Sequence, residues 1–255
     1  MKINEETVAI VTGAASGLGE ATARALASAG APVAVFDLDD ERGVKLAEEI
    51  QGLFVKVDVS DTENVRAAVE TVYQEAGPPR IAVNCAGIAI AQKTVSKGEP
   101  HDMDLFRKVI NVNLIGTANV ATLAAQKMVE ASPLTDDGER GVIINTASVA
   151  AFDGQIGQIA YSASKGAVHG MTLPMARDLS RDGVRVVTIA PGLFGTPMLL
   201  GMPQEVQDAL GAQVPFPSRL GNPAEYGALV RSIVENSMLN GETIRLDGAI
   251  RMAPK

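Results

Sequence analysis

The residues most suggestive of chemistry are Tyr161 and Lys165, which lie four positions apart in a run, 160–179, that predicts a helix. That spacing puts both side chains on one face of a helix, with their Cβ atoms roughly 5–6 Å apart. A free phenol has a pKa of about 10, too high for a base near neutrality. An ammonium group beside it favours the phenolate and lowers that pKa. The pair is therefore a candidate general acid and base.

Ser148 is the third candidate. It follows the apolar run 142–144, so we expect it at the carboxyl end of a strand. There its hydroxyl could hydrogen-bond a substrate oxygen beside the tyrosine and orient it. A lone Tyr-x-x-x-Lys is more often a surface pair on a helix, and the remainder of the chain has to decide between the two interpretations.

A glycine-rich turn stands near the start of the chain. Residues 7–11 predict a strand and residues 20–29 a helix, and between them lies Thr12-Gly13-Ala-Ala-Ser16-Gly17-Leu18-Gly19. Strand, glycine-rich turn and helix in this order are typical of a mononucleotide-binding unit. The glycines let the backbone approach a pyrophosphate, and the helix N-terminus favours its charge. The spacing differs from the general Gly-x-Gly-x-x-Gly fingerprint, so a plain tight turn stays open as an alternative.

Asp37 ends the next predicted strand, 32–36, about 20 residues after the glycines. A carboxylate at this place holds the adenosine ribose hydroxyls and repels a 2′-phosphate. Neither Ser16 nor Leu38 offers a cation to bind such a phosphate. The pattern therefore favours NAD over NADP, with Asp37 as a helix N-cap being the alternative.

The elements that must position these residues alternate along the whole chain. Further strands are expected at 53–57, 81–87, 141–147, 185–190 and 242–246, and further helices at 41–50, 62–76, 104–130 and 224–235. Alternation of this kind predicts one doubly wound, Rossmann-type parallel sheet with helices on both faces, an α/β fold. We expect a single domain, 1–255, in which residues 191–221 form a substrate loop, either a mobile lid or an ordinary packed loop.

Four more positions carry expectations. Asp58 follows the third strand and could accept a hydrogen bond from the adenine amino group, while Ser60 could cap the helix at 62–76. Cys85 is the only cysteine and is expected to be a buried small residue with no nucleophilic role. Asn113 lies inside a predicted helix, where asparagine is mildly unfavourable. It is therefore a candidate functional residue, although a satisfied core amide is the commoner explanation.

Composition limits the classes of function. The formal net charge of −8 argues against binding a phosphate backbone, so no nucleic-acid partner is expected. A single cysteine suits a reducing compartment, and there is no apolar run of about 20 residues that would span a membrane. The short, acidic N-terminus leaves no room for a targeting signal. We expect a cytoplasmic protein without a metal, or one of the mitochondrial matrix if the source is eukaryotic.

Together these motifs resemble the short-chain dehydrogenase/reductase family over essentially the whole chain. The matching residues are Thr12-Gly13-x-x-x-Gly17-x-Gly19, Asn84-Cys85-Ala86-Gly87, Asn113, Ser148, Tyr161-x-x-x-Lys165 and Pro191-Gly192. Only Asn84-Cys85-Ala86-Gly87 departs from the usual pattern, which is Asn-Asn-Ala-Gly in this family.

The resemblance implies a role for each matching residue. Tyr161 would be the acid/base, Lys165 would lower its pKa and bond the nicotinamide ribose, and Ser148 would hold the reacting oxygen. Asn113 would position a water that relays protons from Lys165. Substrate would lie against Ser148, Gln155 and Tyr161. The cofactor would lie against Gly13, Ser16, Gly17, Leu18, Gly19, Asp37, Asp58, Val59, Asn84, Cys85, Ala86, Gly87, Tyr161, Lys165, Pro191, Phe194 and Thr196.

Within the family, the chain is most similar to members that oxidise 3-hydroxyacyl-CoA with NAD, and this similarity lies in residues 83–89, 141–152, 190–197, 214–221 and 244–252. This implies the same small-molecule substrate class, and a homotetramer. A broad hydroxysteroid or secondary-alcohol dehydrogenase is the alternative, and a 3-oxoacyl-carrier-protein reductase is opposed by Asp37 and Leu38. A non-catalytic structural or RNA-processing subunit need not retain a complete set of catalytic residues, which this chain has.

Apolar residues on more than one side of two helices predict subunit contacts. They are Val120, Leu123, Ala124 and Met128 in one helix and Ala167, Met171 and Met175 in the other. The apolar end of the chain around Ile250 is expected to form a second contact, and two different contacts generate a D₂ tetramer. The alternative is a monomer that covers these faces with its own loops.

Overall fold

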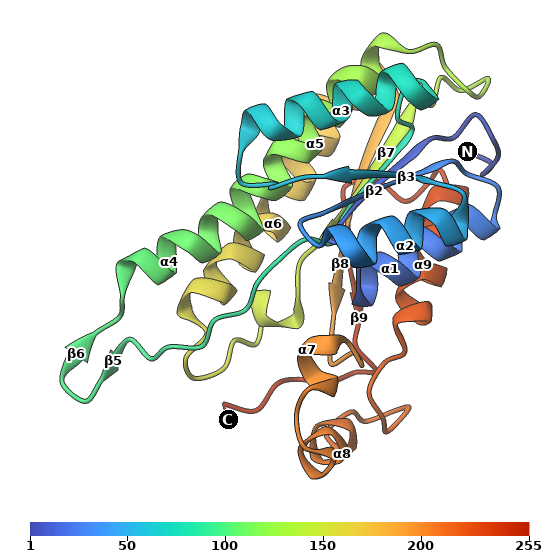
Figure 1. The fold of residues 1–255 in the computed structure, drawn as a ribbon. Coiled ribbons are helices and arrows are strands. Elements are labelled where there is room, and N and C mark those ends of the chain that lie inside the picture. The colour runs from blue at the N-terminus through green and yellow to red at the C-terminus, as the bar shows by residue number, and fades with distance from the viewer. Residues whose placement is uncertain (255) are drawn as a thin grey trace.

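Short runs rich in valine, isoleucine and alanine form the central sheet of the computed structural model, which describes residues 1–254. Seven parallel strands stand in the order β3-β2-β1-β4-β7-β8-β9 (Figure 1). Runs that are apolar throughout suit a sheet buried on both faces. The strands are β1 Ala9–Thr12, β2 Val33–Asp37, β3 Leu53–Lys56, β4 Ile81–Asn84, β7 Gly141–Thr146, β8 Val184–Pro191 and β9 Thr243–Leu246.

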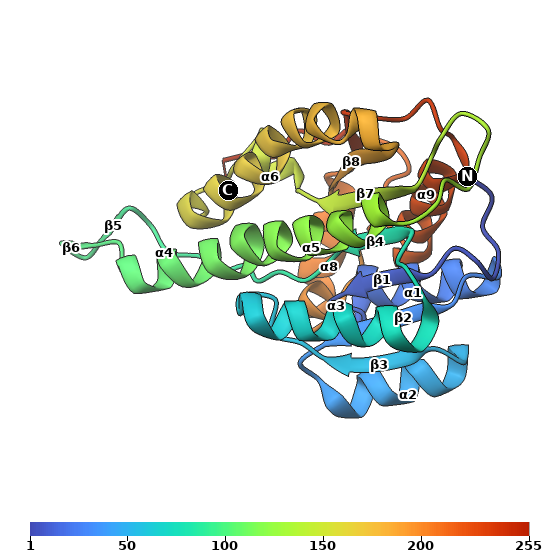
Figure 2. The ribbon, with the colours of Figure 1, turned by 90° about the horizontal axis from the view of Figure 1, so that it is seen from above.

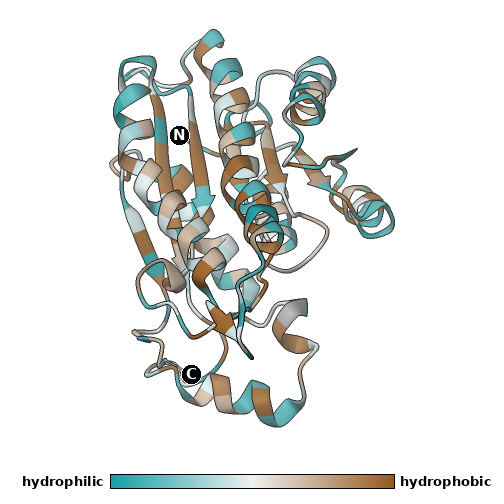
Figure 3. Cartoon of the chain, turned by 90° about the vertical axis from the view of Figure 1, so that its left-hand side faces the viewer, coloured by the Kyte–Doolittle hydropathy of each residue, from teal (hydrophilic) through white to brown (hydrophobic). Residues whose placement is uncertain are grey.

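Helices cover both faces of this sheet (Figure 2). One face packs against α1, α2 and α9, and the other against α3, α5 and α6. Figure 3 shows the strands as mostly hydrophobic and the polar residues as lying towards the outside. The helices are α1 Gly17–Ser28, α2 Asp40–Ile50, α3 Thr62–Ala76, α4 Met103–Ile110, α5 Gly116–Glu130, α6 Ile159–Asp178, α7 Pro197–Leu200, α8 Gln204–Ala212 and α9 Pro223–Glu235.

The strand order reverses beside β1, which lies between β2 and β4. In open α/β sheets a crevice for ligands forms at such a switch point, outside the carboxyl ends of the strands. The predicted fold class, a doubly wound parallel sheet with helices on both faces, is confirmed.

Three segments differ in detail from the sequence-based expectations. The helix expected at 104–130 is interrupted by a π-helical segment, Asn111–Ile115, between α4 and α5. The expected loop at 88–100 carries a small antiparallel hairpin, β5 Val95–Ser96 and β6 Glu99–Pro100, which projects from the body in Figure 1. Two short helices, α7 and α8, occupy part of 191–221.

Two capping expectations are settled by the side chains. Ser60 does not cap α3; the cap is Asp61, whose carboxylate accepts from the backbone N–H groups of Glu63 and Asn64 at 3.0 and 3.1 Å. Aspartate directly before the helix is a strong N-cap, so no second cap is needed. The cap of α2 is Asp39, and Asp37 is therefore not occupied as a helix cap.

The subunit contacts expected from α5 are not available. Val120, Ala124 and Met128 are fully buried within the chain itself, and Leu123 nearly so. Val120 and Leu123 pack in the cluster that includes α3, while Ala124 and Met128 pack in the cluster that includes α6 and the sheet. The second apolar side of α5 is thus covered by neighbouring helices of the same chain.

The residue expected at the end of the chain also faces inwards, whereas those expected on α6 are half-buried. Met171 and Met175 pack against the chain's own core and Ala167 is half-buried. Ile250, only 2% exposed, is buried against Val149 and Val214 rather than by a neighbour. Within residues 1–254 no helix is long and apolar enough to cross a membrane.

Candidate active site

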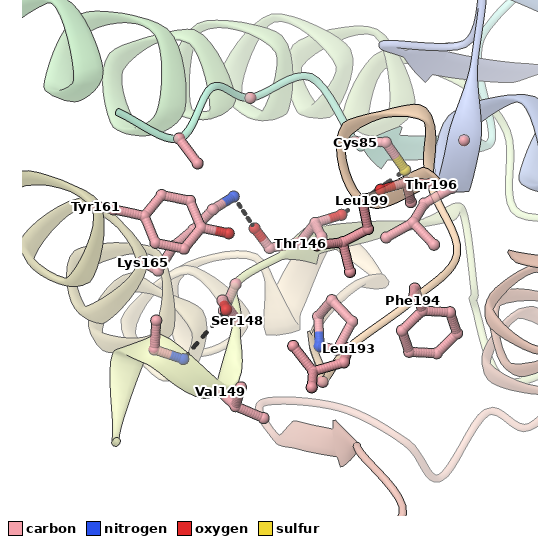
Figure 4. Close-up of a pocket in the computed structure, with 18 of the residues that line it drawn as sticks. Cys85, Thr146, Ser148, Val149, Tyr161, Lys165, Leu193, Phe194, Thr196 and Leu199 are labelled. Atoms are coloured by element: carbon pink, nitrogen blue, oxygen red, sulfur yellow. Dashed lines mark hydrogen bonds between the residues drawn. The ribbon is translucent and has the colours of Figure 1, made fainter. Parts of the chain in front are cut away.

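A cavity of about 370 Å³ opens at the carboxyl ends of the central strands. Its walls come from the glycine-rich turn after β1, the ends of β4 and β7, one face of α6, and the segment after β8 (Figure 4). Among the predicted site residues, it is lined by Gly13, Ser16, Gly17, Leu18, Gly19, Cys85, Gly87, Ser148, Gln155, Tyr161, Lys165, Pro191, Phe194 and Thr196.

The glycine-rich turn packs so tightly that two positions cannot carry a side chain. A Cβ on Gly13, whose φ is +61°, would lie 2.8 Å from the backbone of Ala86. A Cβ on Gly19 would lie 2.2 Å from the carbonyl oxygen of Gly13. The Thr12 hydroxyl oxygen accepts from the N–H groups of Cys85 and Ala86, each at 3.1 Å, and so ties the ends of β1 and β4 together. This leaves the N-terminus of α1 facing the cavity.

Asp37 stands beside this turn at the end of β2. One carboxylate oxygen accepts from Ala15 N at 2.9 Å and the other from Asp39 N at 3.0 Å. These bonds fix the carboxylate without using all its lone pairs. Asp58 is similarly held, accepting from the Ser60 N–H and hydroxyl at 2.9 and 2.7 Å. Asp37 and Asp58 both lie outside the cavity proper, at the ends of the strands on the β2–β3 side.

Three further residues expected to touch the cofactor are not part of the cavity lining. Asn84 is buried within the sheet, where its Nδ2 donates to Oδ1 of Asn145 at 3.0 Å. Val59 is buried against Gly116, whose added Cβ would meet it at 2.6 Å. Ala86 contributes its backbone to the turn rather than its methyl group. The Asn84 side chain therefore joins β4 to β7, and a contact of Asn84 with the cofactor stays a prediction.

Tyr161 and Lys165 do share one face of α6, and both line the cavity. The Lys165 Nζ lies 5.9 Å from the centre of the Tyr161 ring and donates to the carbonyl oxygen of Thr146 at 2.7 Å. Figure 4 shows the Tyr161 hydroxyl, the Lys165 ammonium and the Ser148 hydroxyl pointing into the same part of the cavity. Two groups from α6 and one from the turn after β7 thus converge.

Burial decides the protonation of this pair. It lowers the pKa of Lys165 to about 8, because the charged form is poorly solvated there. It also raises the pKa of Tyr161, an effect that a hydrogen bond with Ser148 offsets only in part. In the chain alone the Tyr161 pKa is thus raised on balance, and its lowering by Lys165 stays a prediction. Desolvation of the phenolate outweighs an ammonium group that is itself bonded to a carbonyl.

Ser148 stands where β7 ends and a short 3₁₀ turn, Val149–Ala151, begins. Its Oγ accepts from Ala150 N at 3.1 Å, and the side chain is buried. With its oxygen serving as acceptor for the turn, its proton can be donated towards the cavity.

Asn113 lies in the π-helical segment and is fully buried. Its Nδ2 donates to Ile88 O at 2.9 Å and to Ser164 Oγ at 3.1 Å, while its Oδ1 accepts from Ile88 N at 2.8 Å. A Cβ on Gly87 would lie 3.2 Å from Asn113 Oδ1 and 3.5 Å from Lys165 Nζ. The amide thus holds residues 87–88 next to Lys165. Single π-helical turns are frequent at functional sites.

Cys85 forms part of the floor beneath the cavity. Burial raises the pKa of its thiol, so little reactive thiolate is present. The Thr146 hydroxyl donates to the Cys85 sulfur at 3.7 Å and shares a 2.7 Å hydrogen bond with the hydroxyl of Tyr226. Thr146 and Tyr226 were not predicted. Thr146 acts on Lys165 through its backbone carbonyl, for which a sequence carries no signal.

The outer part of the cavity is apolar. Gln155 lies at this end, as expected, with its Nε2 donating to Ala253 O at 2.9 Å. Leu193 and Leu199 line the cavity from the predicted substrate loop, 191–221, whereas Val149, Gln158 and Met252 were not predicted as lining residues. Within residues 1–254 no three metal-ligating side chains come close enough together to hold an ion.

Comparison with known proteins identifies the family. The sequence model of the short chain dehydrogenase family matches residues 7–207. The chain belongs to this family. The bovine (Bos taurus) "3-hydroxyacyl-CoA dehydrogenase type-2" is a short-chain dehydrogenase relative 55% identical over 251 residues, which cover 97% of this chain and 96% of the relative.

Two other matches show how widely this short-chain dehydrogenase resembles known proteins. The crystal structure of 3-hydroxyacyl-CoA dehydrogenase type-2 from Mycobacterium avium superposes with a TM-score of 0.94 at 44% identity, covering 100% of both chains. The "Ipsdienol dehydrogenase" of Ips pini is 35% identical, covering 97% of this chain and 98% of the relative. The chain is thus an oxidoreductase with the fold of this family.

Proposed function

We propose that this short-chain dehydrogenase oxidises the hydroxyl group of 3-hydroxyacyl-CoA with NAD, and reduces 3-oxoacyl-CoA in the reverse direction. The observation that carries the proposal is the convergence of Tyr161, Ser148 and Lys165 beside the glycine-rich turn in one cavity. The substrate class is supported by the names of the bovine and mycobacterial relatives.

The residues present fit a dinucleotide. Gly13 and Gly19 keep side chains out of the turn, and the N-terminus of α1 favours a pyrophosphate. Asp37 is fixed where ribose hydroxyls would be held, and Leu38 beside it carries no charge. A 2′-phosphate there would meet a carboxylate, which supports NAD rather than NADP. Bound NAD would supply the nicotinamide C4 that accepts the hydride.

The chain's own residues orient the substrate and move its proton. Ser148 donates a hydrogen bond to the reacting oxygen, and Tyr161 takes the proton from the substrate hydroxyl. For this the raised pKa of Tyr161 has to fall, and a positive charge bound beside the ring has that effect. Lys165, with a pKa of about 8, can pass the proton on. In the same proposal, a water near Asn113 carries it away, and Gly87 keeps that space free of a side chain.

One observation favours a second candidate. The outer cavity is lined by Val149, Leu193 and Leu199, none of which can recognise a thioester or phosphate specifically. A pocket of that chemistry also suits simple secondary alcohols, and the Ips pini relative is named for oxidising a different kind of alcohol. A broad secondary-alcohol or hydroxysteroid dehydrogenase is therefore the competing proposal.

Initial rates of NADH formation separate the two candidates. The panel contains 3-hydroxyacyl-CoA thioesters, a hydroxysteroid and aliphatic secondary alcohols, each measured with NAD and with NADP. We expect the highest kcat/KM for a 3-hydroxyacyl-CoA with NAD. A steroid or simple alcohol with the higher kcat/KM would replace the first proposal by the second.

The Asp37→Ala variant measures the cofactor preference separately. Removing the carboxylate loses charged hydrogen bonds worth roughly 1.5–3 kcal/mol, so NAD should bind about tenfold or more weakly. The kcat/KM ratio of NADP to NAD should rise because the repulsion is gone. Asp37→Asn, which keeps the shape, should show the same direction. An unchanged ratio in both variants would contradict the proposed role of Asp37.

We further propose that the protein works as a homotetramer in the cytoplasm, or in the mitochondrial matrix if its source is eukaryotic. A single cysteine is compatible with these reducing compartments, and a net charge of −8 does not favour nucleic acid. For assembly, α6 presents the exposed apolar side chain of Leu173, and Ile115 and Met103 are also exposed apolar side chains. Figure 2 shows α4 and α6 extending together beyond the sheet.

A further inference from the structure

The last residues of the chain turn back onto the cavity. Residues 248–254, which we call the C-terminal segment, follow β9 and lie in the lower part of Figure 1. Met252 lines the cavity together with Leu193 and Leu199. Ile250, two residues earlier, is buried with Val149, the residue next to Ser148. This segment therefore reaches the same space as the proposed catalytic groups.

Hydrogen bonds join the C-terminal segment to the turn between Ser148 and Tyr161. Ile156 N donates to Pro254 O at 3.0 Å, and Gln155 Nε2 donates to Ala253 O at 2.9 Å. On its other side, Gly248 O accepts from Phe216 N at 3.2 Å. The segment thus bridges the two loops that flank the mouth of the cavity.

Arg245 links the C-terminal segment to the turn between Ser148 and Tyr161 through ion pairs and hydrogen bonds. From β9, its Nε donates to Asp247 at 2.7 Å, and its Nη2 donates to Asp153 at 2.7 Å and to Ile250 O at 2.9 Å. The guanidinium carbon also lies 5.2 Å from the centre of the Phe152 ring. The side chains of Arg245 and Asp247 are only 20% and 8% exposed, so the Arg245–Asp247 bond is poorly screened by solvent.

We propose that the C-terminal segment is the wall of the pocket that receives the alkyl part of the substrate. Met252 sets how long a chain is accepted, and Arg245 is the positioning residue that holds this wall against residues 152–156. The alkyl chain belongs here because Met252, Leu193 and Val149 offer it an apolar surface, whereas coenzyme A needs solvent. The inference rests on the proposed function for its substrate class.

Changing the size of residue 252 tests the wall directly. Met252→Ala should raise the ratio of kcat/KM for long-chain over short-chain 3-hydroxyacyl-CoA by about tenfold, and Met252→Phe should lower it. Met238→Ala is the matched control, because Met238 is 89% exposed and does not line the cavity. Identical chain-length profiles for wild type and both Met252 variants would overturn the proposal.

Removing the charge of Arg245 tests how the wall is held. Arg245→Met should raise KM for the acyl substrate about tenfold and flatten the chain-length profile, while NADH affinity measured by fluorescence stays within about twofold. Arg231→Met is the control, because Arg231 pairs with Glu235 on α9 at 3.1 Å, is 52% exposed and lies outside both the cavity lining and the C-terminal segment, so it should change neither quantity. A lower melting temperature with an unchanged chain-length profile would reduce Arg245 to a structural role and overturn its assignment.

The substrate panel keeps this inference separate from the proposed function. If wild type oxidises no 3-hydroxyacyl-CoA but does oxidise secondary alcohols, the proposed function fails. The Met252 variants are then compared on alcohols of increasing chain length, and a shifted optimum still supports the wall. An unshifted optimum there overturns it independently.

Discussion

At the residue scale, the chemistry of the site depends on how burial shifts the pKa values of Tyr161 and Lys165. Tyr161 has a raised pKa and Lys165 a lowered one, both because the cavity is poorly solvated. Each group is thereby biased towards its neutral form, which favours passing a proton between them and the substrate over holding a charge. The spacing of four residues indicated the pair, but the directions of both shifts depend on burial, which the sequence does not display.

Tyr161→Phe removes the proposed acid/base and little else. We expect kcat to fall by about 10²–10⁴-fold, the usual contribution of such a group. NADH should bind almost as tightly as to wild type, because the ring and its packing remain. Stopped-flow or steady-state rates alongside fluorescence titration measure both. A variant that keeps more than about a tenth of the wild-type kcat would show that another group moves the proton.

Lys165 should make stability depend on pH in a predictable direction. The unfolded chain keeps this proton up to the ordinary value of 10.5, whereas the folded chain loses it near pH 8. Between these values the unfolded state binds more protons, so the free energy of unfolding rises with pH. The shift corresponds to about 3 kcal/mol.

Urea denaturation of wild type and Lys165→Met checks this coupling. Wild type should gain up to about 3 kcal/mol relative to the variant on going from below pH 8 to near pH 10.5. Groups common to both proteins cancel in the difference. A difference in unfolding free energy that stays constant across this window would mean that Lys165 is not desolvated.

At the scale of elements, the alternation of strands and helices was enough to predict the sheet. The expected strands at 32–36 and 81–87 correspond to β2 and β4, and the glycine-rich turn lies between β1 and α1 as expected. Single-residue features were less visible. The apolar pattern of 104–130 is the same with or without a π-helical turn at Asn111–Ile115, so only the unusual asparagine hinted at it.

Contacts between distant elements explain what the sequence could not reveal. The second apolar side of α5 indicated burial correctly, but α3 and α6 of the same chain provide it. Likewise Met252 lies more than a hundred residues from Thr146 along the chain and lines the same cavity. The spacing of apolar residues indicates that a helix face is buried, but it does not indicate which part of the protein buries it.

Asn113→Ala should loosen residues 87–88, which line the cavity next to Lys165. The variant loses the three hydrogen bonds to Ile88 and Ser164, each worth about 0.5–1.5 kcal/mol. We expect the free energy of unfolding to drop by about 2–4 kcal/mol, and kcat to drop as residues 87–88 move relative to Lys165. Asn119→Ala in the adjoining α5, which removes the hydrogen bonds of that amide with Val59 O and the Thr62 hydroxyl, is the control for stability alone. Equal kcat losses in both variants would remove any special role for Asn113.

At the scale of the whole molecule, assembly is the open prediction. Because the expected α5 residues and Ile250 face inwards, the contact between subunits should instead use the outer side of α6, where Leu173 is 43% exposed. Light scattering at micromolar concentration should give the mass of four chains. Leu173→Glu should reduce that mass to two chains or one, because a carboxylate at the centre of a contact is costly to bury. A wild-type mass of one chain would contradict the tetramer.

The central claim is that the bond broken is the C3–H bond of a 3-hydroxyacyl-CoA and that its hydrogen moves as hydride to NAD. The most direct measurement uses a 3-hydroxyacyl-CoA deuterated at C3, with mass spectrometry of the nicotinamide product and of the solvent. The account predicts one deuterium per molecule of NADH formed, none in water, and no transfer by Tyr161→Phe above a hundredth of the wild-type rate, roughly. Deuterium released to water, or thioester consumed without NADH appearing, would contradict it.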